Sequence, residues 1–248
     1  MKVSRVLTGL AGGLVLALLL VATAPARILP GILPGQIKLQ GLSGTLWQGH
    51  ASRTLVAING GWLQLGASEW RLSPLSLLLL SPGLELQSQW GRQTLRADLT
   101  LRSATDVDLE KVDLLLDAGL LRQFLPVALA GDIAAQFEHL KIRQRALQFA
   151  EGRVVWQGAG WLSPEGRRPL GSYAVDVRTS DEGVISGKII TLAGELQAQG
   201  DLRLQQSQYE IDLSLQGKAL DDPQLRQALQ LVAAPAGDGF RVELEGGL

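Results

Sequence analysis

The stretch LRLQQSQYEIDLSL, residues 202–215, alternates apolar and polar side chains in two runs separated by a short polar segment. A period of two places every second side chain on the same face of a β-strand. One face of each strand is then apolar and the other polar, which is typical of an antiparallel sheet with one face in water. This stretch therefore predicts two neighbouring strands and a mainly β fold.

Four further stretches show the same alternation, and most of them lie close to residues that favour turns. They are residues 84–90, 95–102, 173–178 and 242–245. Such spacing is typical of strands that follow one another in a meander. We therefore expect an extended, curved antiparallel sheet, an open half-barrel, within a body that covers residues 37–248.

Two segments depart from the strand pattern. Asp221-Asp222-Pro223 offers an N-cap and a proline at the first helical position, and apolar residues then recur at helical spacing from Leu225 to Val232. A second helix is predicted over Leu114–Leu125, although Val112–Leu116 fits a strand equally well. The sequence thus predicts one or two short helices beside the sheet.

An uncharged apolar run, Val6–Ala24, follows Lys2 and Arg5 and precedes Arg27. At about 1.5 Å per residue, a helix over this run is about 28 Å long, close to the thickness of the bilayer core. Basic residues on the short side predict a cytoplasmic N-terminus. We therefore expect a tail and single transmembrane anchor over residues 1–26, a Pro/Gly linker over 27–36, and a body across the inner membrane, in the periplasm.

The residues that we assign to the anchor are Val6, Gly9, Gly13, Ala17 and Ala24. The two glycines form a G-x-x-x-G pair that could pack against another membrane helix, although small residues are common in such segments. Ala24-Pro25-Ala26 also has the pattern of a signal-peptidase site. Cleavage there would release the same body, so attachment to the membrane stays open at this point.

Two kinds of recurrence run through the body. Leu129–Gln136 resembles Leu192–Gln199, which indicates either repeated strand pairs in one sheet or a coincidence in a chain rich in Leu, Gly and Gln. Six tryptophans are present, and they either fill the core of the sheet or line a groove for a lipid or a partner strand. We expect Trp70 and Trp90 in the core.

Residues suited to catalysis are scarce. The chain has 23 basic and 24 acidic residues with no basic tract, which argues against nucleic acid as a partner, and it has no cysteine. Its two histidines, His50 and His139, lack the spacing of a zinc motif. Asp106 with Asp108, and Asp221 with Asp222, could be acid/base pairs or calcium ligands, but a turn and a helix cap explain them better. The sequence predicts no enzyme and no catalytic, cofactor-binding or metal residue.

Taken in order, several segments resemble the type II secretion system protein N family (general secretion pathway protein N). Their marks are structural Gly, Trp and Pro patterns that extend over nearly the whole chain. They are the N-terminal anchor, Gly41–Gly49, Trp70–Leu78, Leu129-Ala130-Gly131, and the series from Tyr209 through Asp222-Pro223 and Leu225 to Gly237–Phe240 and Gly246.

The resemblance implies a single-pass inner-membrane accessory of the machine that exports folded proteins across the Gram-negative outer membrane, in contact with other components of that machine. The resemblance assigns no functional site residue and no cofactor to this chain. The family is also similar in architecture to AsmA-like and TamB-like proteins, whose β-groove is associated with lipid movement between membranes. A lipid-handling groove is therefore the alternative function, and an exported enzyme is a second rival that the missing catalytic residues argue against.

Overall fold

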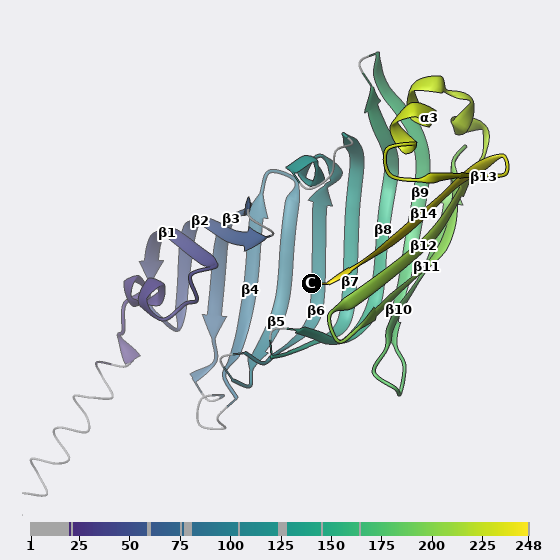
Figure 1. Cartoon of the computed structure of the whole chain (residues 1–248). Coiled ribbons are helices and arrows are strands. Elements are labelled where there is room, and N and C mark those ends of the chain that lie inside the picture. Colours follow the sequence, from purple (N-terminus) through teal and green to yellow (C-terminus); the bar gives the residue numbers. More distant parts are fainter. Residues whose placement is uncertain are drawn as a thin grey trace, which may run out of the picture. The chain divides into compact units, whose positions relative to one another are not determined.

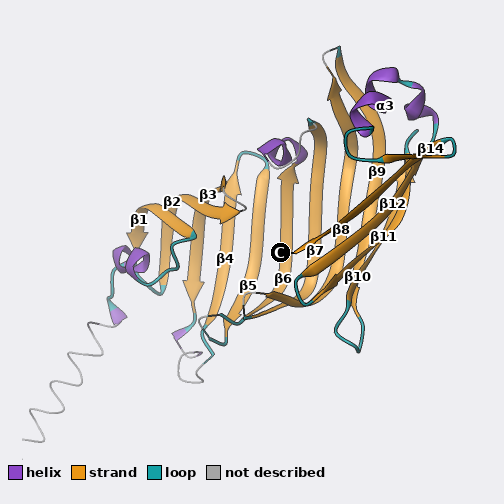
Figure 2. Ribbon diagram, viewed as in Figure 1, coloured by secondary structure: helices purple, strands orange, loops and turns teal. Residues whose placement is uncertain are grey.

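The structure is a computed structural model that describes residues 20, 22–58, 61–74, 76, 81–103, 105–123, 128–144, 146–163 and 165–247. The described chain divides into two compact units, with the boundary between Gln89 and Trp90. Figures 1 and 2 show that both units are built mainly from strands. Within the described ranges, no helix is both long enough and apolar enough to cross a bilayer.

In the first unit a short 3-10 helix precedes a strand meander. Each strand pairs antiparallel with the next one in sequence. This order needs no crossover connection, because an antiparallel pair can be joined at one end of the two strands. The elements are η1 (Ala26–Gly31), β1 (Ile37–Gly44), β2 (Gln48–Ile58), β3 (Gly61–Leu72) and β4 (Gly83–Trp90).

Trp70 organises the core of the first unit. Its side chain is buried with Ala26 and Ala51, and its indole Nε1 donates a hydrogen bond to the carbonyl of Leu46 at 3.1 Å. The ring lies across Gly49 of β2, where an added Cβ would come within 2.3 Å of it. The prediction that Trp70 belongs to the core is confirmed.

The segment that follows the predicted anchor takes part in this core. Ala26 is 1% exposed, Pro25 forms a bridge with Thr45, and the Leu46 amide donates to the carbonyl of Ala24 at 2.8 Å. The predicted linker, residues 27–36, therefore begins inside η1, which packs against β1. The domain boundaries expected from the sequence stay a prediction.

The described residues of the second unit form a longer meander and three short helices. Its strand order is β5 to β12 in sequence, then β14 and β13, and neighbouring strands in this order pair antiparallel. The strands tilt progressively from β6 to β14 (Figure 1), as twisted sheets do. The elements are β5 (Gln93–Leu101), β6 (Val107–Asp117), η2 (Ala118–Gln123), β7 (Leu129–Arg143), β8 (Ala146–Ser163), β9 (Gly166–Thr179), β10 (Ile185–Ala193), β11 (Gln197–Gln205), β12 (Gln208–Gln216), η3 (Lys218–Asp221), α3 (Pro223–Leu229), β13 (Ala234–Ala236) and β14 (Gly239–Gly247).

The predicted mainly β, antiparallel fold with short helices is thus confirmed. The helix at Asp222 is also confirmed: its carboxylate accepts from the backbone amides of Gln224 (2.9 Å) and Leu225 (3.3 Å), and Pro223 opens the helix. The predicted helix over Leu114–Leu125 is wrong in its first part. That part belongs to β6, because hydrogen bonding to strands on both sides overrides local helical spacing. Residues 118–123 form η2, and residues 124–125 lie outside the described residues.

Trp90 contradicts its prediction, since its side chain is 40% exposed. It is the last residue of β4, directly before a turn at Gly91-Arg92. A side chain at a hairpin end has fewer cross-strand neighbours than one in the middle of a strand, so alternation alone overestimates its burial.

One face of the second unit is apolar in an unbroken row across the sheet, and we call it the apolar face. Direct cross-strand partners form this row from β6 to β14. They are Val112, Phe137, Gly152, Val177, Gly187, Leu202, Ile211 and Leu244.

A helical cap covers one end of this face. Leu220 of η3 and Leu225 of α3 are buried in one cluster with Tyr173, Phe240 and Val242. The Tyr173 hydroxyl donates to the carbonyl of Leu196 at 3.0 Å, and burial raises the pKa of Tyr173 to about 12. The helices therefore brace β14 from its apolar side.

The two resembling Leu-Ala-Gly segments have a common backbone feature. Gly131 has a φ of 115° and Gly194 a φ of 121°, a region that favours glycine. In each case an added Cβ would strike the backbone of a neighbouring strand, at 2.6 Å from the Gln157 oxygen and 2.2 Å from Gly171 Cα respectively. The recurrence thus marks two points where strands approach closely.

Candidate functional site

The paired aspartates of the second unit make structural contacts. Asp106 accepts a hydrogen bond from the backbone amide of Gln144 at 2.9 Å, and this bond chiefly lowers the pKa of its carboxyl. Asp108 pairs with Arg102 (2.9 Å) and with Arg143. Burial alone would raise the pKa of Asp108, but the hydrogen bonds and charges of the two arginines outweigh burial and lower it. The predicted turn role fits these contacts.

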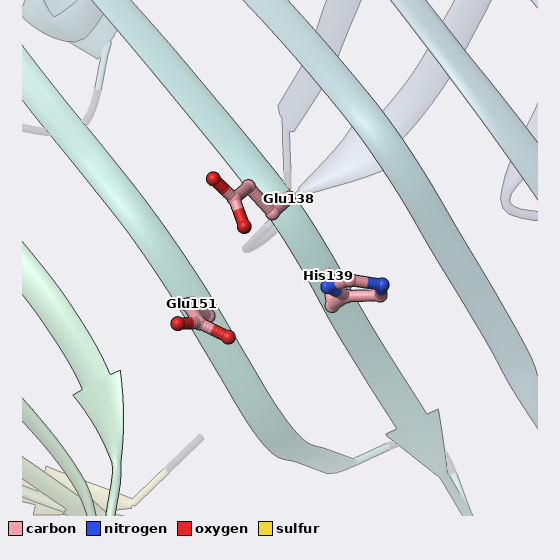
Figure 3. Close-up of side chains that lie close together, drawn as sticks. All are labelled: Glu138, His139 and Glu151. Atoms are coloured by element: carbon pink, nitrogen blue, oxygen red, sulfur yellow. The ribbon is translucent and has the colours of Figure 1, made fainter.

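The histidines lie in different units: His50 is half-buried in β2, and His139 is exposed in β7. Among the described residues, one group of three possible metal ligands, Glu138, His139 and Glu151, has its ligand atoms within 4.8 Å of one another (Figure 3). A bulge between Phe137 and His139 shifts the register against β8 and brings these side chains together. The sequence contains no motif for this group, since its members come from two strands.

This group is fully at the surface and offers one imidazole and two carboxylates. It borders a shallow depression of about 500 Å³ beside β6 and β8. Exposed acidic groups of this kind are common without a bound ion, so we assign no metal to it.

The face opposite the apolar one carries a row of charges, and we call it the polar face. Along direct cross-strand partners from β5 to β10, basic and acidic residues mostly alternate, as in the Arg153–Asp176 pair at 3.4 Å. The last three positions, on β11, β12 and β14, are all acidic. The row reads Arg96, Asp113, Gln136, Arg153, Asp176, Lys188, Asp201, Asp212 and Glu243.

A second acidic pair lies next to this row. Glu210 of β12 is directly opposite Glu245 of β14, an arrangement of like charges that destabilises a strand pair. Arg203 of β11 lies opposite Glu210 on its other side. In the first row, Arg241 holds Asp212 through two hydrogen bonds of 2.9 and 2.6 Å and contacts Glu243 at 2.9 Å. The hydrogen bond from Arg241 lowers the pKa of Asp212, and the same pair raises that of Arg241. We call Asp212, Glu243, Glu210 and Glu245 the acidic edge.

The outer side of β14 is only partly covered. β13 pairs with Gly239, Phe240 and Arg241, and among the described residues no strand pairs with β14 beyond Arg241 on that side. Glu243, Leu244 and Glu245 are exposed there. The sequence predicts β14 as a strand, but it contains no signal for which strand ends the sheet.

The predicted anchor residues are mostly untested by this geometry. Val6, Gly9, Gly13 and Ala17 lie outside the described residues. Ala24 is described, and its carbonyl accepts the hydrogen bond from Leu46 noted above.

Fold and surface together define a class of mainly β protein: a sequential antiparallel meander that ends in an open, acidic strand. Residues 35–243 match the family model for the type II secretion system (T2SS), protein N. The chain is 26% identical to the type II secretion system protein N of Aeromonas hydrophila over 232 residues, which cover 88% of this chain and 86% of the relative. It is 28% identical to the protein of the same name from Vibrio cholerae over 243 residues, 93% of each chain.

The chain therefore belongs to the type II secretion system protein N family and is a component of that secretion system. The resemblance inferred from the sequence is confirmed. Comparison with solved structures gives no match.

Proposed function

We propose that this chain is an accessory component of a type II secretion system that acts as an inner-membrane-anchored scaffold in the periplasm. The family match over residues 35–243 carries this proposal, because it extends over most of both units. In this proposal residues 6–24 cross the inner membrane, the N-terminus is cytoplasmic, and the body is a curved half-barrel that docks onto other secretion components by its surfaces and edges.

The contacts of residues 24–26 support a retained anchor. Cleavage after Ala26 would remove a residue that is buried beside Trp70 and would also remove the Pro25–Thr45 bridge. A mature chain that began at Arg27 would therefore lack part of the core of its first unit. N-terminal sequencing of the membrane fraction tests this point: an intact N-terminus is expected, and a chain starting at Arg27 would contradict the anchor.

The role in secretion is tested by deleting the protein in its host and measuring export of type II substrates. We expect export to fall, and affinity purification of the full chain after cross-linking to recover other secretion components. Unchanged export together with an absence of such partners would contradict the proposal.

The apolar row provides the observation that favours a second candidate, a lipid-binding groove. Half-buried Val177, Leu202 and Ile211 lie along the middle of this row, away from the helical cap. Extraction of the purified protein followed by mass spectrometry would reveal stoichiometric lipid if the groove is occupied. Altered outer-membrane permeability with unchanged secretion in the deletion strain would favour this candidate over the scaffold.

A further inference from the structure

We propose that the open outer side of β14 binds, by strand addition, an extended segment of a partner protein in which basic residues alternate with apolar ones. This inference rests on the proposed scaffold role and specifies the docking surface and the chemistry of the partner. Three features carry it: the backbone groups at the edge, the charges beside them, and one exposed leucine.

The hairpin that joins β13 to β14 determines which backbone groups point outward. Ala236 and Gly239 flank a two-residue turn, so they form a hydrogen-bonded pair, and such pairs alternate along an antiparallel ladder. Pro235, which has no N–H, accordingly falls on the intervening pair with Phe240. Continuing the alternation, Glu243 and Glu245 direct their N–H and C=O groups away from β12, toward the uncovered side.

The hairpin between β11 and β12 gives the same result independently. Gln205 and Gln208 flank its two-residue turn, which directs the backbone groups of Tyr209 and Ile211 toward their partners in β14. Those partners are Gly246 and Leu244, so Glu243 and Glu245 must face outward. An unpaired row of this kind is a template for another strand.

The charges indicate what that strand must carry. Two arginines lie beside the four carboxylates of the acidic edge: Arg241 against Asp212 and Glu243, and Arg203 opposite Glu210. The edge therefore keeps an excess of negative charge. A strand added beside β14 would place side chains directly opposite Glu243 and Glu245. Opposite-charge cross-strand pairs are stabilising, so Lys or Arg at these two positions would complement the acidic edge.

The apolar face requires the residue between them to be apolar. Leu244 is 46% exposed at the edge, whereas Val242, nearer to the helical cap, is 9% exposed. An apolar side chain on the added strand would cover Leu244 and extend the apolar row by one strand. The edge thus fits a segment of the pattern basic, apolar, basic.

A second copy of this chain fits less well. Two β14 edges paired with each other would set Glu243 and Glu245 against glutamates of the same sequence, which like-charge repulsion disfavours. The proposed occupant is therefore a different chain.

Binding of a labelled synthetic peptide to the full chain in detergent, followed by fluorescence anisotropy, tests the proposal. The probe alternates lysine with valine, and a matched peptide alternates glutamate with valine. We expect the lysine peptide to bind at least about tenfold more tightly than the glutamate peptide. Glu245→Pro removes an outward N–H and should weaken binding of the lysine peptide by about tenfold or more.

A charge swap keeps the test valid if the proline variant fails to fold. The double variant Glu243→Lys/Glu245→Lys should reverse the preference between the two peptides, whereas the control Glu138→Lys/Glu151→Lys on β7 and β8 should leave it unchanged. Equal binding of both peptides to the unmodified chain, or an unchanged preference after the swap, would overturn the proposal.

Two further outcomes separate this inference from the proposed function. A concentration-dependent dimer that is lost in Glu245→Pro would show that a second copy of this chain binds the edge. That result would overturn the proposal that the partner is a different protein. If the peptide does not bind but cross-linking still recovers secretion components, the proposal of strand addition at β14 is overturned and the proposed function stands. If the peptide binds but no secretion component is recovered, the proposed scaffold function is contradicted.

Discussion

The first strand of the first unit and the last full-length strand of the second unit are protected in different ways. β1 is packed by η1, and the adjoining Pro25 bridges Thr45, so the chain's own N-terminal segment covers that region. β14 is covered only as far as Arg241, by a strand of three residues that contains Pro235. Proline and charge are known means of discouraging indiscriminate strand pairing. The first of these strands is thus packed by the chain's own N-terminal segment, whereas the uncovered part of the second carries exposed charged residues.

Substitution of Trp70 is expected to destabilise the first unit, which contains the covered strand β1, more than any other change considered. Trp70→Ala removes a buried indole and its hydrogen bond to Leu46, and it leaves a cavity beside Ala26 and Gly49. We expect the free energy of unfolding of the first unit to fall by about 3–5 kcal/mol, measured by urea denaturation. Trp62→Ala is the control: Trp62 is 40% exposed and contacts the Lys38 ammonium at 4.0 Å, so its loss should cost about 1 kcal/mol or less. Equal losses in both variants would contradict the buried role of Trp70.

We expect the stability of β14, whose outer side is open, to depend on the helical cap. Leu225→Ala empties a buried position that packs with Phe240 and Val242 of β14, and we expect a loss of about 2–4 kcal/mol in the stability of the second unit. The rate of hydrogen exchange of the β14 amides should also increase. Leu231→Ala, at a 77% exposed side chain, should change neither quantity measurably. Unchanged exchange in Leu225→Ala would show that β14 is stable without the cap.

A smaller effect is expected at the start of α3. Asp222→Ala removes the side chain that accepts hydrogen bonds from the amides of Gln224 and Leu225, and the loss should be about 1 kcal/mol. Its neighbour Asp221 lies in η3, where no capping bond from its side chain is found among the described residues, so Asp221→Ala serves as the matched control. Thermal unfolding of both variants gives the comparison, and a larger loss in the control would contradict the cap.

The smallest expected effect sharpens the description of the acidic edge. Arg241 lowers the pKa of Asp212 below its ordinary 3.8, so the folded state binds fewer protons there than the unfolded state. The resulting stabilisation is present above pH 3.8 and is lost as the pH falls through the lowered value. In Arg241→Gln the melting temperature should be slightly lower at neutral pH and should converge with that of the unmodified chain in acid. A difference that persists in acid would assign the effect to packing rather than to the charge pair.

The sequence was sufficient to predict the elements whose local pattern and environment agree. β11, β12 and β14 alternate cleanly because one face meets the core and the other meets water. The Asp222-Pro223 pair predicts its helix because capping is a local interaction.

The remaining features depend on register, which local patterns do not encode. β8 runs from Ala146 to Ser163 with several shifts in pairing against both neighbours, so its residues do not keep a single alternation. The proximity of Glu151 to His139 results from one such bulge. The acidic edge is a further case, because Glu210 meets Glu245 only after η3, α3 and β13 have intervened in the chain.

The sequential strand order has a consequence for how the chain acquires its structure. Within each unit nearly every strand pairs with the strand that immediately precedes it, so the loop closed at each step is short and costs little entropy. As the chain is synthesised from its N-terminus, each completed strand offers an unpaired side on which the next strand can form. Most strands therefore need no distant segment as a pairing partner. β13 is the exception, since it takes its place only after β14. The outer side of β14 beyond Arg241 is one such unpaired side, and no other strand among the described residues occupies it.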